Sequence, residues 1–181
     1  MEIKINGFGE VSKEVKYNVY DVQLPYVFNK IKSAILEHIP SVMIEHVGSS
    51  SVPGIGGRNV VDMAIPVEEE RHNEINSRLK RLGFQNSPFE HYLPLLVGSV
   101  IWQGNNYDIL LYVIEPNNKI YKDWISFRDY MRNHPDDAKK YDELKHAIVI
   151  GGNNKNDAYQ DAKAPFLQKM NDRIKESTIL K

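Results

Sequence analysis

A turn rich in glycine and serine joins two apolar segments early in the chain. The stretch EHVGSSSVPGIGGRNVVDMAIPVEEE, residues 45–70, places three serines, four glycines and a proline between two apolar runs. Glycine permits positive φ angles and a close approach of the backbone to other groups. Residues 42–47 alternate between apolar and polar and residues 60–66 are almost wholly apolar, so both are predicted as strands. We expect them to be neighbours in one sheet, joined by the turn at residues 48–59.

The other elements follow from apolar spacing and end signals. A 3.6-residue apolar period predicts a helix over about residues 23–39, with Pro25 in its first turn and Pro40 after its end. Residues 68–82 begin acidic, end basic and precede Gly83, which predicts a second helix. Strands are expected within 91–104 and 106–116, joined by the hairpin-type sequence QGNN.

The last third of the chain is predicted to be helical. Helices are expected over residues 121–134, from Pro135 onward, and over residues 157–177, with a loop at 151–156. This order of elements predicts an α+β fold in which helices cover one sheet mostly on one side.

Composition excludes several classes of protein. A length of 181 residues, with 41% hydrophobic and 26% charged residues, is typical of one globular domain. The net charge of −1 gives no strong signal for nucleic-acid binding, and the absence of cysteine excludes disulfides, thiolate zinc sites and a cysteine nucleophile. With no signal-like start and no apolar run near the ~20 residues that span a bilayer, we expect a soluble cytoplasmic protein without a membrane partner. The oligomeric state is left open.

The turn itself suggests anion binding. A Gly-Ser turn that leaves a strand offers N–H groups and hydroxyls to an anion. Its spacing matches neither a Walker A loop nor Gly-x-Gly-x-x-Gly. The alternative is a connecting turn that needs glycine, with Asp62 capping a nearby group.

Three segments carry a family resemblance. HVGSSSVPGIGGRNVVDMAIPV resembles the signature of the GrpB-like family, FRDYMRNHPDDAKKYDELK resembles that family's arginine-aspartate-tyrosine and histidine-proline helix pair, and DAYQDAKAPFL is similar to its closing helix. The resemblance runs from about Tyr17 to Met170, so it implies one domain over residues 1–181 with a core at about 17–170.

That family is similar in turn to the polymerase-β-type nucleotidyltransferases. The resemblance therefore implies a mixed, nucleotidyltransferase-like sheet, a Gly-Ser turn that binds nucleotide phosphate, and a following strand whose aspartates hold Mg²⁺. It implies phosphate binding by Gly48, Ser49, Ser50, Ser51 and Arg58. It also implies a catalytic, metal-binding role for Asp62.

This sequence departs from that pattern in its carboxylates. Ala64 stands where active nucleotidyltransferases usually carry a second one. Asp108 and Glu115 are candidate partners for Asp62, and Asp108 is preferred because it opens the strand DILLYVIE. The family's lysine-proline pair is Arg58-Asn59 here.

Three further residues are second-tier candidates. His46 precedes the turn and is about as consistent with a ligand contact as with a backbone hydrogen bond within a strand. Arg128 and Arg132 are i,i+4 neighbours that could hold phosphates, although an ion-pair network with Asp129, Asp136 or Asp137 is favoured. The six scattered histidines do not predict a zinc site.

Two functions remain in view. The first is Mg²⁺-dependent transfer of a nucleotidyl group to an unknown acceptor, which the presence of Asp62 favours. The second is a catalytically inactive module that binds a nucleotide or another phosphate-bearing small molecule, which Ala64 favours. Relatives fused to dephospho-coenzyme A kinase associate the family with coenzyme A or nucleotide metabolism.

Overall fold

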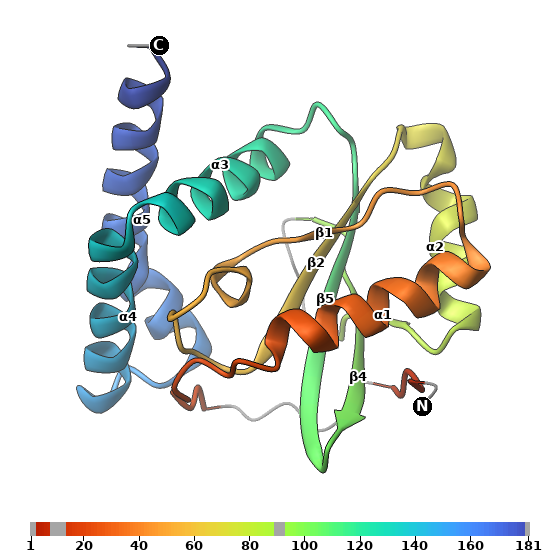
Figure 1. Ribbon diagram of the computed structural model, residues 1–181, viewed down its shortest axis with the longest axis horizontal. Helices are drawn as coiled ribbons and strands as arrows, with labels where there is room; N and C mark the ends of the chain where they lie inside the picture. Colours follow the sequence, from red (N-terminus) through yellow and green to blue (C-terminus); the bar gives the residue numbers. More distant parts are fainter. Residues whose placement is uncertain (1–2, 8–13, 89–92, 180–181) are drawn as a thin grey trace.

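The computed structural model describes residues 3–7, 14–88 and 93–179. Its centre is a five-stranded mixed sheet in the order β1-β2-β5-β4-β3 (Figure 1). The strands are β1 (Glu45–His46), β2 (Val60–Pro66), β3 (Gln85–Asn86), β4 (Leu96–Trp102) and β5 (Asn105–Ile114). The predicted α+β class and mixed sheet are confirmed.

The turn and its flanking strands are arranged as the sequence predicts. β1 runs antiparallel to β2, with Glu45 opposite Ala64, and β2 runs parallel to β5, with Asp62 opposite Leu110. β4 and β5 form the expected hairpin, in which Gln103 and Gly104 take φ angles of 50° and 80°. Positive φ at both central residues matches the twist of the flanking strands.

β1 is shorter than the predicted strand at residues 42–47, because the ladder covers only Glu45 and His46. Continuing the same register would bring Met43 opposite Pro66, the last residue of β2. Proline has no N–H to donate, so regular pairing ends there. In the predicted strand at 91–104, β4 begins at Leu96, and His91 and Tyr92 lie outside the described residues.

The helices lie close to their predicted positions. They are α1 (Leu24–His38), α2 (His72–Arg81), α3 (Lys119–Asn133), α4 (Pro135–Ile150) and α5 (Asn156–Ile179), with 3₁₀ turns η1 (Ser49–Ser51) and η2 (Glu69–Arg71). The predicted helix at 68–82 thus begins as η2, and Gly83 follows its end with a φ of 111°. In the part of the chain that the structure describes, no helix is both long and apolar enough to cross a membrane.

The main core lies between one face of the sheet and the helices α1 and α2. Ile31 and Ile35 of α1 pack in one buried cluster with Val61 and Met63 of β2, and Ile75 of α2 joins them. Burying such a side chain contributes about 1.5–3 kcal/mol. Because strand residues alternate between faces, Asp62 lies on the opposite face from this core.

The last three helices form a second packed group. α3, α4 and α5 contact one another and stand to one side of the sheet (Figure 1). Their cluster includes Phe127 and Tyr141, and it also buries Val52 and Ile55 from the 48–59 segment. The Gly-Ser turn is therefore held between the sheet and the C-terminal helices.

Candidate functional site

The backbone at Gly48 explains why the turn begins with glycine. Its φ of 67° and ψ of −173° form a combination that side-chain-bearing residues rarely adopt. A Cβ added to Gly48 would lie 2.6 Å from Oδ2 of Asp62. The turn then closes as η1, where the Ser51 hydroxyl donates a hydrogen bond of 2.6 Å to the Gly48 carbonyl. The glycine lets the Asp62 carboxylate lie directly against the turn.

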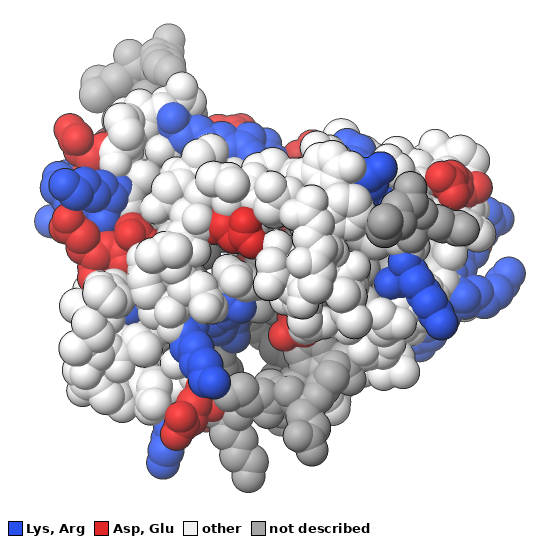
Figure 2. All heavy atoms as spheres, turned by 60° about the horizontal axis from the view of Figure 1, so that its bottom comes forward, with Lys and Arg blue, Asp and Glu red and all other residues white. Residues whose placement is uncertain are grey.

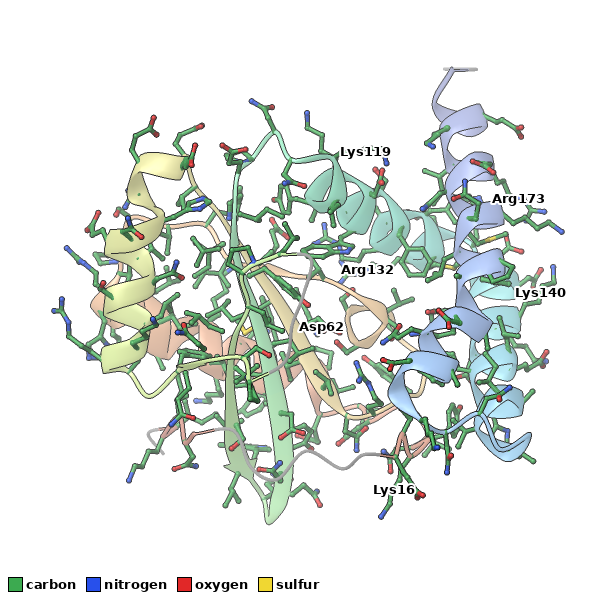
Figure 3. All side chains as sticks on the ribbon, turned by 180° about the vertical axis from the view of Figure 1, so that it is seen from behind. Lys16, Asp62, Lys119, Arg132, Lys140 and Arg173 are labelled. Carbon is green, nitrogen blue, oxygen red and sulfur yellow. The ribbon has the colours of Figure 1, made fainter. Side chains whose placement is uncertain are left out.

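A cavity of about 1530 Å³ opens on the face of the sheet opposite α1. Its walls include Asp62, Leu110 and Tyr112 from the sheet, the turn from Gly48 to Ser50, and residues of α3, α4 and α5. Seen from behind, Asp62 of β2 lies within the sheet, with the three C-terminal helices to one side (Figure 3). In Figure 2, basic side chains lie beside a hollow in the surface.

Asp62 is half-buried and has cationic neighbours. Burial raises its pKa to about 6, while the charges of Arg58, Lys163 and Lys145 act in the opposite direction. Its backbone N–H points toward the Ser50 hydroxyl at 3.5 Å. Three cations therefore lie within electrostatic range of this one carboxylate.

Lys145 of α4 connects the C-terminal helices to the turn. The residue is 1% exposed, and Nζ donates hydrogen bonds to the Gly56 carbonyl and to the Ser49 hydroxyl, the latter at 3.3 Å. Nζ also lies 5.2 Å from the ring centre of Tyr141. Burial, and next the charge of Lys163, lower the pKa of Lys145 to about 7.

Lys163 of α5 is held in a similar way. Its residue is 9% exposed, and Nζ lies 4.3 Å from the ring centre of Tyr159. Burial, followed by the charge of Arg58, lowers the pKa of Lys163 to about 8, while Asp62 acts to raise it. The two helices thus each bring one buried lysine to the cavity wall.

His46 lies behind the turn. Its ring stacks on Phe28 of α1 with centres 4.5 Å apart, and Nε2 is 3.2 Å from the Ser50 hydroxyl. Burial, with the charges of Arg132 and Arg128, lowers the pKa of His46 to about 3. The ring is therefore neutral at physiological pH and supports Ser50 from the core side.

Arg128 and Arg132 attach α3 to the turn and to β1. Arg128 donates to Glu45 Oε2 at 2.6 Å and to the His46 carbonyl at 3.1 Å, and it pairs with Asp129. Arg132 donates two hydrogen bonds to the Ser51 carbonyl, at 3.0 and 2.7 Å. Both guanidinium groups thus bind backbone or carboxylate oxygens of this segment, and Asp129 is the member of the expected ion-pair network that takes part.

Asp62 and Asp108 lie on the same face of neighbouring strands but are not directly opposite each other. Leu110 lies opposite Asp62, whereas Asp108 lies opposite Val60 and accepts a hydrogen bond of 3.0 Å from Asn106. Glu115 follows the end of β5. Neither Asp108 nor Glu115 is among the described residues that line the cavity.

The donors present do not fit the pair of Mg²⁺ ions that the family resemblance implies. Among the described residues, no three His, Asp or Glu side chains form a group that could hold a metal ion. Ala64 follows Asp62 on the same strand face without an oxygen ligand, and the charged neighbours of Asp62 are cations. A single ion between Asp62 and Asp108 stays a prediction.

The family assignment rests on most of the chain. The family described as GrpB protein matches residues 14–173. The chain belongs to the GrpB family. A search of curated proteins found no match.

Solved structures place this GrpB-family chain among nucleotidyltransferase-like folds. The conserved protein GrpB from Enterococcus faecalis is 20% identical with a TM-score of 0.72, over 90% of this chain and 99% of that one. The GLD-2/RNP-8 complex is 13% identical with a TM-score of 0.55, over 78% of this chain and 58% of that one. The MgGTP-bound Cid1 poly(U) polymerase is 12% identical with a TM-score of 0.51, over 73% of this chain and 44% of that one. At these identities the likeness shows the fold.

Sequence reasoning missed Lys145 and Lys163. Each follows a tyrosine by four residues, and each interrupts an apolar helical stripe: Ala138, Tyr141, Lys145, Ile148 in α4 and Tyr159, Lys163, Phe166, Met170 in α5. In each helix the 3.6-residue apolar period assigns the lysine position to the core, and a lysine at such a position is a sequence signal for a buried functional cation.

Proposed function

We propose that this GrpB-family protein binds a nucleotide or another phosphate-bearing small molecule in the cavity beside the turn. The observation that carries the proposal is the convergence of Arg58, Lys145 and Lys163 on one side of the Gly48–Ser50 segment. Charge-assisted hydrogen bonds from such groups to phosphate oxygens are roughly twice as strong as neutral ones. The shared fold with a MgGTP-bound polymerase supports a nucleotide as the ligand.

The cavity also provides a surface suited to a flat apolar group. Tyr112 of β5 and Trp124 of α3 line it with ring centres 4.8 Å apart. Aromatic rings of this kind offer faces on which a nucleobase can stack. A ligand with an anionic part and an aromatic part would use both regions.

Mg²⁺-dependent nucleotidyl transfer is the second candidate. It is favoured by Asp62, which lies directly against Gly48 in the position that the resemblance gives to a metal-binding carboxylate. In this candidate, Asp62 and Asp108 would be the metal ligands and catalytic residues, and the acceptor is unknown. The lack of an oxygen ligand at Ala64 makes this candidate the weaker one.

A ligand screen by thermal shift, followed by titration calorimetry, tests the proposal. The panel comprises nucleoside mono-, di- and triphosphates, coenzyme A and dephospho-coenzyme A, each with Mg²⁺ and with chelator. We expect at least one compound to raise the unfolding midpoint, because a ligand that binds only the native state stabilises it. If no compound binds under either condition, the proposed function is wrong.

Pyrophosphate release from nucleoside triphosphates distinguishes the two candidates. The binding function predicts no Mg²⁺-dependent release above the background without protein. Release by the wild type that Asp62→Asn abolishes would establish the transfer activity instead.

A further inference from the structure

We propose that the cavity binds the phosphate chain of its ligand without a divalent metal ion, through the ammonium groups of Lys145 and Lys163. This inference rests on the proposed function and specifies how the same site holds a di- or triphosphate group. In related folds that use Mg²⁺, a cation has to offset the charge of the phosphates. Here two lysines on the helical wall supply that charge.

Burying the two lysines costs hydration of their ammonium groups, and a merely structural contact does not explain this cost. Each lies in an apolar helical stripe with 9% or less of its residue exposed. An ammonium group loses hydration there, which disfavours its charged form. Lys145 gains hydrogen bonds to Ser49 and Gly56 in return, whereas Lys163 lies against the face of Tyr159.

The side chains around the turn carry an excess of positive charge, which favours the binding of an anion. Lys145 and Lys163 repel each other, and Arg58 adds a third positive charge near Asp62. Two carboxylates oppose these charges: Asp142 acts on Lys145, and Asp62 acts on both lysines. Farther along the cavity wall, Asp123 is paired with Lys119, and Glu14 forms a backbone β-bridge with Lys155. Asp157 also lines the cavity. A phosphate chain beside the turn would relieve the repulsion between the lysines.

The same arrangement opposes a divalent cation. A Mg²⁺ ion near Asp62 would meet the positive charges of Lys145, Lys163 and Arg58. Mg²⁺ is usually held by one or two carboxylates together with phosphates. The neighbouring strand presents Leu110 opposite Asp62, and its Asp108, two residues away on the same face, does not line the cavity. Asp62 then acts as a neighbour that limits the affinity for anions.

The test measures the binding of inorganic tripolyphosphate and ATP by calorimetry, in EDTA and in excess Mg²⁺. We expect the wild type to bind both in EDTA and more weakly when Mg²⁺ neutralises the phosphates. Lys145→Met and Lys163→Met should each weaken binding by about tenfold or more, because each removes a charge-assisted contact. Asp62→Asn should bind as tightly as the wild type or more tightly, which is the opposite of a metal ligand.

Lys139→Met is the matched control, because this α4 lysine is 77% exposed and should bind like the wild type. If Lys145→Met does not fold, judged by circular dichroism, Lys163→Met alone decides. Binding that requires Mg²⁺ or that Asp62→Asn abolishes would overturn the inference while leaving the proposed function intact. Wild-type affinity in both lysine variants would also overturn it. No binding of either probe in any condition would overturn the inference too, and the wider ligand screen then decides the proposed function separately.

Discussion

At the scale of single residues, Gly48 carries the tightest geometric demand. Its backbone angles exclude most side chains, and its missing Cβ leaves room for the Asp62 carboxylate. Gly48→Ala should lower the free energy of unfolding by about 2 kcal/mol or more, from backbone strain of about 1–3 kcal/mol together with the clash. Urea denaturation followed by circular dichroism measures this loss.

Gly54 provides the control for Gly48. Its φ is 86°, but a Cβ there would meet no atom within 4 Å. Gly54→Ala should therefore cost only the backbone term, roughly 1–2 kcal/mol. Equal losses in the two variants would mean that the contact between Gly48 and Asp62 contributes nothing.

The two buried lysines predict how anion binding depends on pH. A bound anion favours the charged form of each lysine, so affinity is highest below pKa values of about 7 for Lys145 and about 8 for Lys163 and is lost as pH rises through them. Burial, Lys163 and Arg58 lower the pKa of Lys145, whereas Asp142 and Asp62 act to raise it. Affinity for tripolyphosphate should fall by about tenfold or more between about pH 7 and about pH 9.

Calorimetry over that range checks the pH prediction. The Lys145→Met, Lys163→Met double variant corrects for titration of the phosphate, since it keeps that titration and lacks both ammonium groups. A wild type whose pH dependence matches the double variant would contradict the prediction.

At the scale of elements, α3 supports the turn through its arginines. Arg128 has 12% of its side chain exposed and contacts both Glu45 and the His46 carbonyl. Arg128→Met should destabilise the protein by about 1.5–3 kcal/mol, the usual range for hydrogen bonds to charged groups. Lys119→Met, on the same helix but with a 76% exposed side chain, should cost less than about 1 kcal/mol. Similar urea midpoints for the two variants would show that α3 does not support the turn through Arg128.

Element types were predictable because each depends on local pattern. The apolar period of α1 and the proline at the start of α4 locate those helices to within a few residues. The length of β1 was not predictable in this way, because it depends on the register that places Pro66 near Met43. Local alternation carries no information about which partner residue lacks an N–H.

At the scale of the whole molecule, the sequence predicted one wall of the candidate site and missed the other. Gly48, Ser49 and Asp62 belong to one short segment, so their proximity follows from a single strand–turn–strand unit. Lys145 and Lys163 come from helices whose docking depends on the buried cluster that contains Tyr141 and Ile55. Tertiary packing of that kind has no short-range signature apart from a lysine at a core position.

The contact between Ser49 and Lys145 joins residues 96 positions apart, and this separation has a consequence for folding. Bringing distant residues together costs loop-closure entropy, which has to be met before the contact contributes stability. During synthesis the sheet and its turn emerge well before the helices that carry the two lysines. A nascent chain can thus complete its main core before the helical wall of the candidate site is in place, and the proposed ligand binding would be among the last properties that the molecule acquires.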